Sequence, residues 1–190
     1  MKFFKHFIYI LLISFCTVLM PQAAHADFPE RPVGFVVIDQ DGGVDGAMYK
    51  SWRQVVKWAY HFPSYQITDD AAPQQVVSEA VRSGAKLDKA SLQALAEKSR
   101  VDVLVVAHIY ALDETMVSGW GFRLDNETYM RVEASADLYV YKKDGDKFLK
   151  KKLRERGLRE LGNYEKPEET IKWQLSKLVN TIENRPIIGA

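Results

Sequence analysis

VDVLVVAHIYAL, residues 101–112, decides the fold because it carries the strongest strand signal in the chain. Its side chains are almost continuously apolar and many are β-branched, which is typical of a strand that is covered on both faces. We therefore expect a long central strand of a β-sheet here. Asp113 and Glu114 follow and are expected to end it, because charged side chains rarely lie in buried strands.

The residues before this strand predict alternating strands and helices. In order they are a strand at 33–38, a helix at about 48–62, a short strand at 65–68, a helix from 73 to a stop at Gly84, and a helix from 89 to about 99. Asp88 is the expected N-cap of the last of these helices, because its short carboxylate can accept hydrogen bonds from the first free N–H groups.

The residues after the central strand predict a β-hairpin. From Glu127 onward apolar and polar residues alternate strictly, which indicates a half-exposed antiparallel strand with Asp137 and Tyr139 on its polar face. The turn sequence KDGD at 143–146 then leads into a lysine-rich return strand at 148–156. So many lysines favour an edge position, where they discourage pairing with other sheets.

A helix closes the chain. Gly157 and Gly162 lead out of the hairpin, and apolar residues from Ile171 to Ile182 repeat at helical spacing before Pro186. The predicted order is β-α-β-α-α-β-β-β-α. The expected fold class is α/β (α+β), with a single mixed β-sheet and helices packed on it. Since no repeat or linker divides it, the stretch 27–190 is expected to form one domain.

The first 26 residues have the order of a secretory signal peptide. Two lysines precede an apolar run at 7–20, and Ala24 and Ala26 place small residues at the alternating positions that signal peptidase requires. The run is shorter than the roughly 20 residues that span a bilayer as a helix. We therefore expect cleavage after Ala26 and export to the periplasm, cell surface or medium, without stable membrane insertion afterwards. An uncleaved anchor is the alternative.

Cleavage would also change the composition. It removes Cys16, the single cysteine, so the mature protein is expected to be free of disulfides. It removes two of the 26 basic residues and none of the 25 acidic ones, which changes the net charge from +1 to −1. A near-neutral chain gives no global electrostatic reason to bind nucleic acid.

Common catalytic and metal-binding motifs are missing from the sequence. It contains no H-E-x-x-H, C-x-x-C, G-x-S-x-G or Walker-type loop. His61 and His108 lack a second ligand at metal-binding spacing. We therefore expect no metal, no cofactor and no catalytic residue, and an enzyme is the less favoured class. His108 is expected to be a hydrogen-bonded histidine of the core or its rim, and His61 to complement a helix dipole.

The loop DQDGGVDG, residues 39–46, is the first candidate ligand site. Asp39, Asp41 and Asp45 alternate with glycines at the end of a predicted strand, where ligands of α/β proteins often bind. The spacing fails as an EF-hand, because Val44 stands where the turn glycine should be. A turn that caps the next helix is the alternative.

The segment SGWGF, residues 118–122, is the second candidate. Trp120 and Phe122 lie among glycines in an expected loop, and exposed aromatic side chains suit a protein partner or a sugar face. Alternatively, both rings fold back onto the core. The basic run at 150–156 is expected to protect the sheet edge, with a polyanionic envelope component as the alternative ligand.

Residues 92–109, a helix followed by an aspartate and a long apolar strand, resemble the same step in bacterial envelope proteins related to the TolB N-terminal domain. That group includes curli-secretion lipoproteins and lipoprotein activators of penicillin-binding proteins. The hairpin at 136–148 and the closing helix are similar to theirs, although this chain lacks their lipid-bearing cysteine. The resemblance implies a non-enzymatic part in envelope assembly through protein contacts, and it transfers no site residue.

We therefore expect an exported, non-catalytic binding or assembly module of the cell envelope, with envelope proteins as partners. Two alternatives stay open. One is an exported hydrolase in which carboxylates such as Asp39, Asp41 and Asp113 converge. The other is a carrier of a small molecule or glycan at residues 118–122.

Overall fold

The computed structural model describes residues 30–61, 63–69, 71–118, 128–162 and 164–186. In these ranges the order of elements is β-α-β-α-α-β-β-β-α, which confirms the predicted fold class. The strands are β1 (Arg31–Ile38), β2 (Tyr65–Ile67), β3 (Val103–Ser118), β4 (Thr128–Lys142) and β5 (Lys147–Glu160). The helices are α2 (Gly46–Ala59), α3 (Ala72–Arg82), α4 (Lys89–Lys98) and α5 (Pro167–Ile182).

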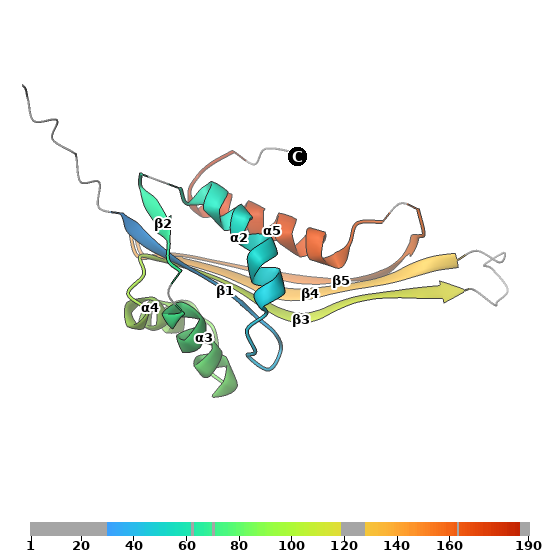
Figure 1. Ribbon diagram of the computed structural model, residues 1–190, viewed down its shortest axis with the longest axis horizontal. Helices are drawn as coiled ribbons and strands as arrows, with labels where there is room; N and C mark the ends of the chain where they lie inside the picture. Colours follow the sequence, from blue (N-terminus) through green and yellow to red (C-terminus); the bar gives the residue numbers. More distant parts are fainter. Residues whose placement is uncertain (1–29, 62, 70, 119–127, 163, 187–190) are drawn as a thin grey trace, which may run out of the picture.

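The strands form one mixed sheet in the order β2-β1-β3-β4-β5. β1 runs parallel to both β2 and β3, whereas β3, β4 and β5 form an antiparallel meander. The long strand β3 is central and the lysine-rich strand β5 lies at an edge, as predicted (Figure 1).

The helices begin and end at signals that the sequence carries. Asp88 is the N-cap of α4, and its Oδ1 accepts a hydrogen bond of 2.9 Å from the backbone N–H of Ser91. Pro73 lies in the first turn of α3, where its missing N–H costs nothing. Gly84 follows α3 with a φ of +78°, a left-handed conformation that glycine adopts without strain.

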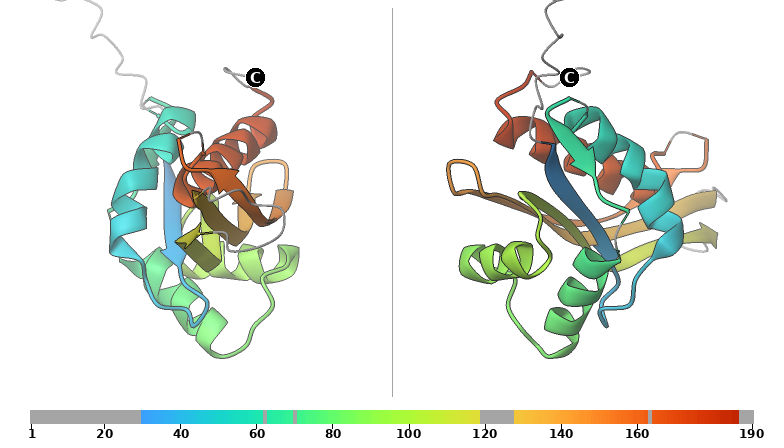
Figure 2. Two further views of the ribbon diagram at one scale, coloured as in Figure 1. Left: turned by 90° about the vertical axis from the view of Figure 1, so that its right-hand side faces the viewer. Right: turned by 60° about the vertical axis from the view of Figure 1, so that its left-hand side comes forward.

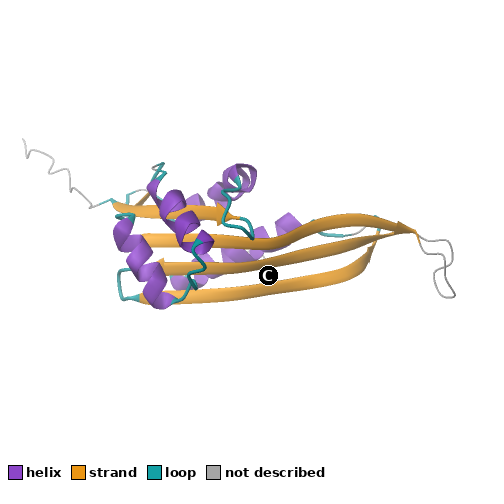
Figure 3. Cartoon of the chain, turned by 90° about the horizontal axis from the view of Figure 1, so that it is seen from below, coloured by secondary structure: helices purple, strands orange, loops and turns teal. Residues whose placement is uncertain are grey.

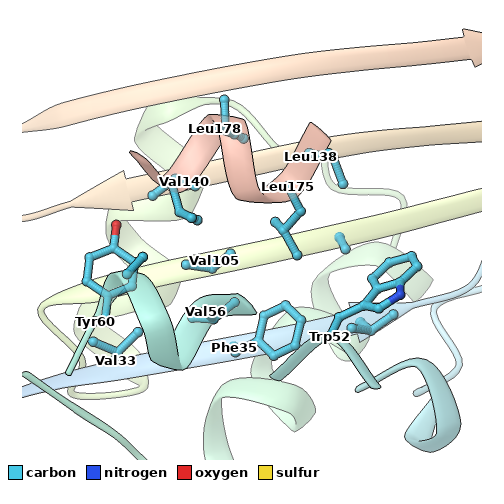
Figure 4. Close-up of a cluster of buried hydrophobic side chains, with 14 of the residues drawn as sticks. Val33, Phe35, Trp52, Val56, Tyr60, Val105, Leu138, Val140, Leu175 and Leu178 are labelled. Carbon is cyan, nitrogen blue, oxygen red and sulfur yellow. The ribbon is translucent and has the colours of Figure 1, made fainter. Parts of the chain in front are cut away.

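Each face of the sheet has its own helical layer (Figures 1 and 2). On one face α2 and α5 bury a core around Trp52, Val56 and Leu175, which Figure 4 shows together with the sheet residues Val105 and Leu138. On the other face α3 and α4 bury a smaller core; its members include Val77, Leu92, Leu104, Val106 and Tyr139. The apolar runs of β1 and β3 are therefore covered on both faces.

Beyond the helices the meander continues as a distal arm, which we define as residues 113–118, 128–133 and 156–160 (Figure 3). Asp113 and Glu114 were expected to end the strand, and this is wrong: β3 stays paired with β4 as far as Ser118. These two residues end the burial instead, because both are exposed. Gly157, expected outside the hairpin, lies within β5 opposite Val132.

The predicted polar face of β4 also needs correction. Asp137 and Tyr139 are only 4% and 3% exposed, although their alternation with apolar residues predicted an open face. The reason is tertiary: Tyr139 packs into the core beneath α3 and α4, and cationic side chains of β5 cover Asp137. The prediction holds within the arm, where Arg131 is exposed.

Candidate functional site

The acidic loop at 39–46 connects β1 to α2, and its carboxylates hold its own turns. Asp39 Oδ1 accepts hydrogen bonds from the backbone N–H groups of Asp41 (3.0 Å) and Gly43 (2.6 Å). Asp45 is the N-cap of α2, with 3.0 and 2.9 Å to the N–H groups of the next turn. Asp41 is exposed. The loop therefore turns the chain and caps α2, as the alternative interpretation of its sequence expects. Ligand binding by the loop stays a prediction.

The part of the chain that the structure describes contains no group of three or more His, Cys, Asp or Glu side chains that could hold a metal ion. Asp113, the other carboxylate of the hydrolase alternative, lies in the distal arm. It accepts a hydrogen bond of 3.0 Å from Thr115 and lies 3.9 Å from the guanidinium of Arg131. Asp39 and Asp113 thus have separate local partners.

A polar cluster around the buried Asp137 lies where the sheet leaves the cover of α3 and α4. We call it the Asp137 cluster; its members are His108, Tyr110, Asp137, Tyr139, Lys150 and Arg154. Arg154 Nη2 lies 2.7 Å from Asp137 Oδ1, and Lys150 Nζ lies 2.9 Å from Oδ2. The Tyr139 hydroxyl donates a third hydrogen bond to Oδ2 at 3.1 Å. Both carboxylate oxygens therefore have charged partners.

These contacts determine the protonation state of Asp137. Burial alone would raise the pKa of this carboxyl, but the hydrogen bonds and charges of Lys150 and Arg154 outweigh it and hold the pKa below its ordinary value. A general acid or base near neutral pH needs the opposite shift. Asp137 is thus an ionised link between β4 and β5, which Arg154 extends by donating to the carbonyl oxygen of Ala136 at 2.8 Å.

His108 lies opposite Asp137 in the register of β3 and β4 and is 8% exposed. Its ring packs against Tyr110 with centroids 4.4 Å apart, and Nδ1 lies 3.2 Å from the Tyr110 hydroxyl. Burial lowers the pKa of His108, and the nearby backbone of Gln40 and charge of Asp137 only partly oppose this shift. The imidazole is therefore neutral, as expected of a hydrogen-bonded histidine at the rim of the core.

The distal arm carries exposed apolar side chains. Met116 is 62% exposed and Val117 is 36% exposed on β3, and Leu158 on β5 is 52% exposed. The strand register places Met116 on the face of α2 and α5, and Leu158 on the opposite face. The arm is therefore apolar on both faces. Trp120 and Phe122 belong to the segment between β3 and β4 and lie outside the described residues.

A second exposed surface lies on α2 and extends to α5. Trp58 on α2 is 75% exposed and stands between two hollows. One, of about 370 Å³, is lined by Val55, Trp58, Ala59, Ser176, Asn180, Arg185 and Pro186. The other, of about 300 Å³, is lined by Gln54, Lys57, Trp58 and His61. We call these two hollows together the Trp58 groove. His61 Nδ1 lies 3.2 Å from the carbonyl oxygen of Trp58, close to the end of the helix.

Sequence reasoning missed both the Asp137 cluster and Trp58. For Trp58 a signal existed: six residues separate it from Trp52, so it lies about 120° around the helix from the buried stripe. A tryptophan outside the apolar stripe of a helix is a candidate for binding. For Asp137 no signal of comparable strength existed, because its cations come from the neighbouring strand.

Comparisons with known proteins identify no family. No protein-family model matches the chain, and no curated protein matches it. Solved structures with a similar chain path include a hypothetical protein from Chlamydia trachomatis, with a TM-score of 0.41 and 10% identity over 82% of this chain and 97% of that one.

Two further similar structures come from other bacteria. A lipoprotein from Neisseria meningitidis has a TM-score of 0.34 and 15% identity over 81% of this chain and 99% of the other. The C-terminal domain of LpoB from Salmonella enterica has a TM-score of 0.31 and 6% identity, over 76% and 91%. The resemblance to the TolB-related group stays a prediction. Among the described residues, no helix combines the length and apolar character needed to cross a membrane.

Proposed function

We propose that this protein is an exported, non-catalytic binding or assembly module of the cell envelope, and that its distal arm contacts a protein partner. The observation that carries the proposal is the exposure of Met116, Val117 and Leu158 on strands that have left the cover of the helices. Apolar side chains gathered on an uncovered projection are typical of interaction surfaces. Burial against a partner would remove them from water.

The expected partner is a different protein rather than a second copy. Edge-to-edge pairing of two β5 strands would bring their cationic rows together, and like charges on neighbouring strands are destabilising. In each chain one face of β5 carries a row of four cations, Lys150, Lys152, Arg154 and Arg156. A heterologous protein avoids this repulsion.

The chemistry of the carboxylates and of His108 agrees with a binding role. Asp137 is ionised and paired, His108 is neutral, and Asp39 and Asp45 accept hydrogen bonds from their own loop. A carboxylate-dependent hydrolase would need two of its acids to converge on a substrate. The exposed arm offers contact area instead, so binding is the function that the geometry supports best.

The test uses the full chain, expressed in cells, with a photo-crosslinking residue at position 118, which is exposed on β3 next to Met116 and Val117. We expect a saturable adduct with one envelope protein, and at least a tenfold lower yield in the double variant M116S/L158S, because both apolar contacts are lost. Val44→Ser is the matched control, since Val44 is 44% exposed but lies in the loop after β1. An unchanged yield in M116S/L158S, or an adduct consisting of two copies of this chain, would overturn the proposal.

Export is tested separately. We expect the protein in the periplasmic, surface or medium fraction to begin at Asp27, as read by mass spectrometry of its N-terminal peptide. A protein found in the cytoplasm with residues 1–26 intact would contradict the proposed location.

A further inference from the structure

We propose that the Trp58 groove binds an acidic peptide segment that carries an apolar side chain. This deepens the proposed function, on which it rests for a role in protein binding, by naming the chemistry of a partner. It uses helices α2 and α5 rather than the distal arm, so the two surfaces can be tested independently.

Trp58 occupies an exposed position on α2. Its side chain is 75% exposed, whereas Trp52 on the same helix is fully buried, so Trp58 contributes little to the core. Tryptophan presents a large rigid surface with an N–H donor and is enriched among residues that dominate binding energy. The hollows on its two sides are lined by different residues of α2, and the larger one is shared with α5. An extended segment can thus pass over Trp58 and place side chains on both sides.

The described lining of the Trp58 groove is positively charged. Lys57 and Arg185 line the groove, His61 adds an imidazole, and among the residues that the structure describes no carboxylate lines either hollow. Arg185 Nη1 donates to the carbonyl oxygen of Ala59, and within the described residues the other N–H groups of its guanidinium have no hydrogen-bond partner. A guanidinium with unused donors binds carboxylates well. The groove is therefore complementary to an acidic ligand.

The two hollows of the Trp58 groove match the size of peptide side chains. Hollows of about 300 and 370 Å³ lie at the lower end of the range for small-molecule sites, and each can receive one or two side chains. Two such hollows separated by an aromatic ring fit successive side chains of one peptide better than a single compact ligand. The occupant we infer is thus a segment of another protein with acidic residues around an apolar one.

The experiment measures fluorescence anisotropy of two labelled 12-residue peptides against the full mature chain at low salt. One peptide surrounds a leucine and a phenylalanine with glutamates, and the other replaces each glutamate with lysine. We expect saturable binding of the acidic peptide and at least tenfold weaker binding of the basic one. Trp58→Ala should weaken the acidic peptide at least tenfold.

Matched variants separate the groove from general charge and from folding. Lys57→Gln should weaken binding several-fold, whereas Lys50→Gln, on the same helix but outside the groove, should not. Unfolding midpoints of all variants should stay near wild type. M116S/L158S should leave peptide binding unchanged, so a failure of the arm proposal would not imply a failure here.

Four outcomes would overturn the inference. The first two are that the acidic and basic peptides bind with the same affinity, and that Trp58→Ala binds the acidic peptide as tightly as wild type does. The chain forms a dimer that Trp58→Ala dissociates, which would make a second copy the occupant. A chain that ends at Pro186 binds the peptide while the full chain does not, which would make residues 187–190 the occupant.

Discussion

The helix-covered base of the sheet and its distal arm are built from the same strands but differ in what covers them. Residues 103–109 of β3 are all buried, whereas residues 116–118 of the same strand are exposed. Backbone pairing with β4 continues through both parts. Strand pairing alone can therefore extend a sheet past its core, and the helices decide where stability is concentrated. We expect the base to determine the free energy of unfolding and the arm to be free for contacts.

The largest expected effect is in the base. Trp52→Ala removes a fully buried side chain between α2 and the sheet and should lower the free energy of unfolding by about 3–5 kcal/mol in a urea titration. Trp58→Ala is the matched control on the same helix and should change it by less than about 0.5 kcal/mol. Equal effects of the two substitutions would contradict the described packing of α2.

The second-largest loss of stability is expected when a buried ion pair at the end of the base is broken. Lys142 Nζ lies 2.7 Å from Glu183 Oε2, and both side chains are less than 10% exposed. Lys142→Met leaves a buried carboxylate without its cation and should cost about 3 kcal/mol. The double variant K142M/E183L should recover most of this loss, because no uncompensated charge remains. If the double variant is as unstable as Lys142→Met, the unpaired carboxylate of Glu183 is not the cause of the lost stability.

The Asp137 cluster lies between base and arm and should show a smaller effect that depends on pH. Asp137→Asn should lower the free energy of unfolding by about 1–2 kcal/mol at pH 7, since Lys150 and Arg154 are partly open to water. The folded-state pKa of Asp137 lies below the unfolded value of about 3.9. The folded state therefore binds this proton less readily, and wild type loses the contribution as the pH falls from about 4 downward.

Urea titrations of wild type and Asp137→Asn at several pH values measure this difference. The gap between the two proteins should be constant above about pH 5 and shrink at lower pH. A gap that stays constant down to pH 2 would show that the ionised carboxylate of Asp137 does not stabilise the fold.

The smallest effect is expected in the arm. Leu158→Ser exchanges an apolar side chain that is already 52% exposed, so the free energy of unfolding should change by less than about 0.5 kcal/mol. The same titration provides the measurement. A loss above about 2 kcal/mol would mean that the arm belongs to the core, and the contrast between the two regions would fail.

Local patterns predicted the elements well and the extent of the strands less well. The N-cap at Asp88, the stop at Gly84 and the central position of β3 were confirmed, because each depends on neighbouring residues or on continuous apolar character. β3 extends past its predicted end at Leu112, because the charged residues that follow do not stop its pairing with β4. These residues mark only the end of the buried part of β3. Strands whose faces are uncovered can pair whether their side chains are charged or apolar.

In the candidate sites, too, features that depend on neighbouring residues were predicted and features that depend on distant residues were not. The roles of Asp39 and Asp45 within their loop were foreseen as one alternative, since turns and caps are local. Asp137 was expected to be exposed because alternation along β4 cannot show that Lys150 and Arg154 of the next strand cover it. The Trp58 groove depends on α5, which is distant in sequence, so its shape was not predictable.

By itself the sequence determined the order of elements, their caps, the mixed character of the sheet and which strands are continuously apolar. These properties follow from backbone geometry and from the period of side-chain polarity, both of which act over a few residues. Only the tertiary structure decided the strand order β2-β1-β3-β4-β5, the burial of Asp137 and the separation of base from arm. These depend on which distant surfaces come together, because burial is a property of the partner that covers a residue as much as of the residue itself.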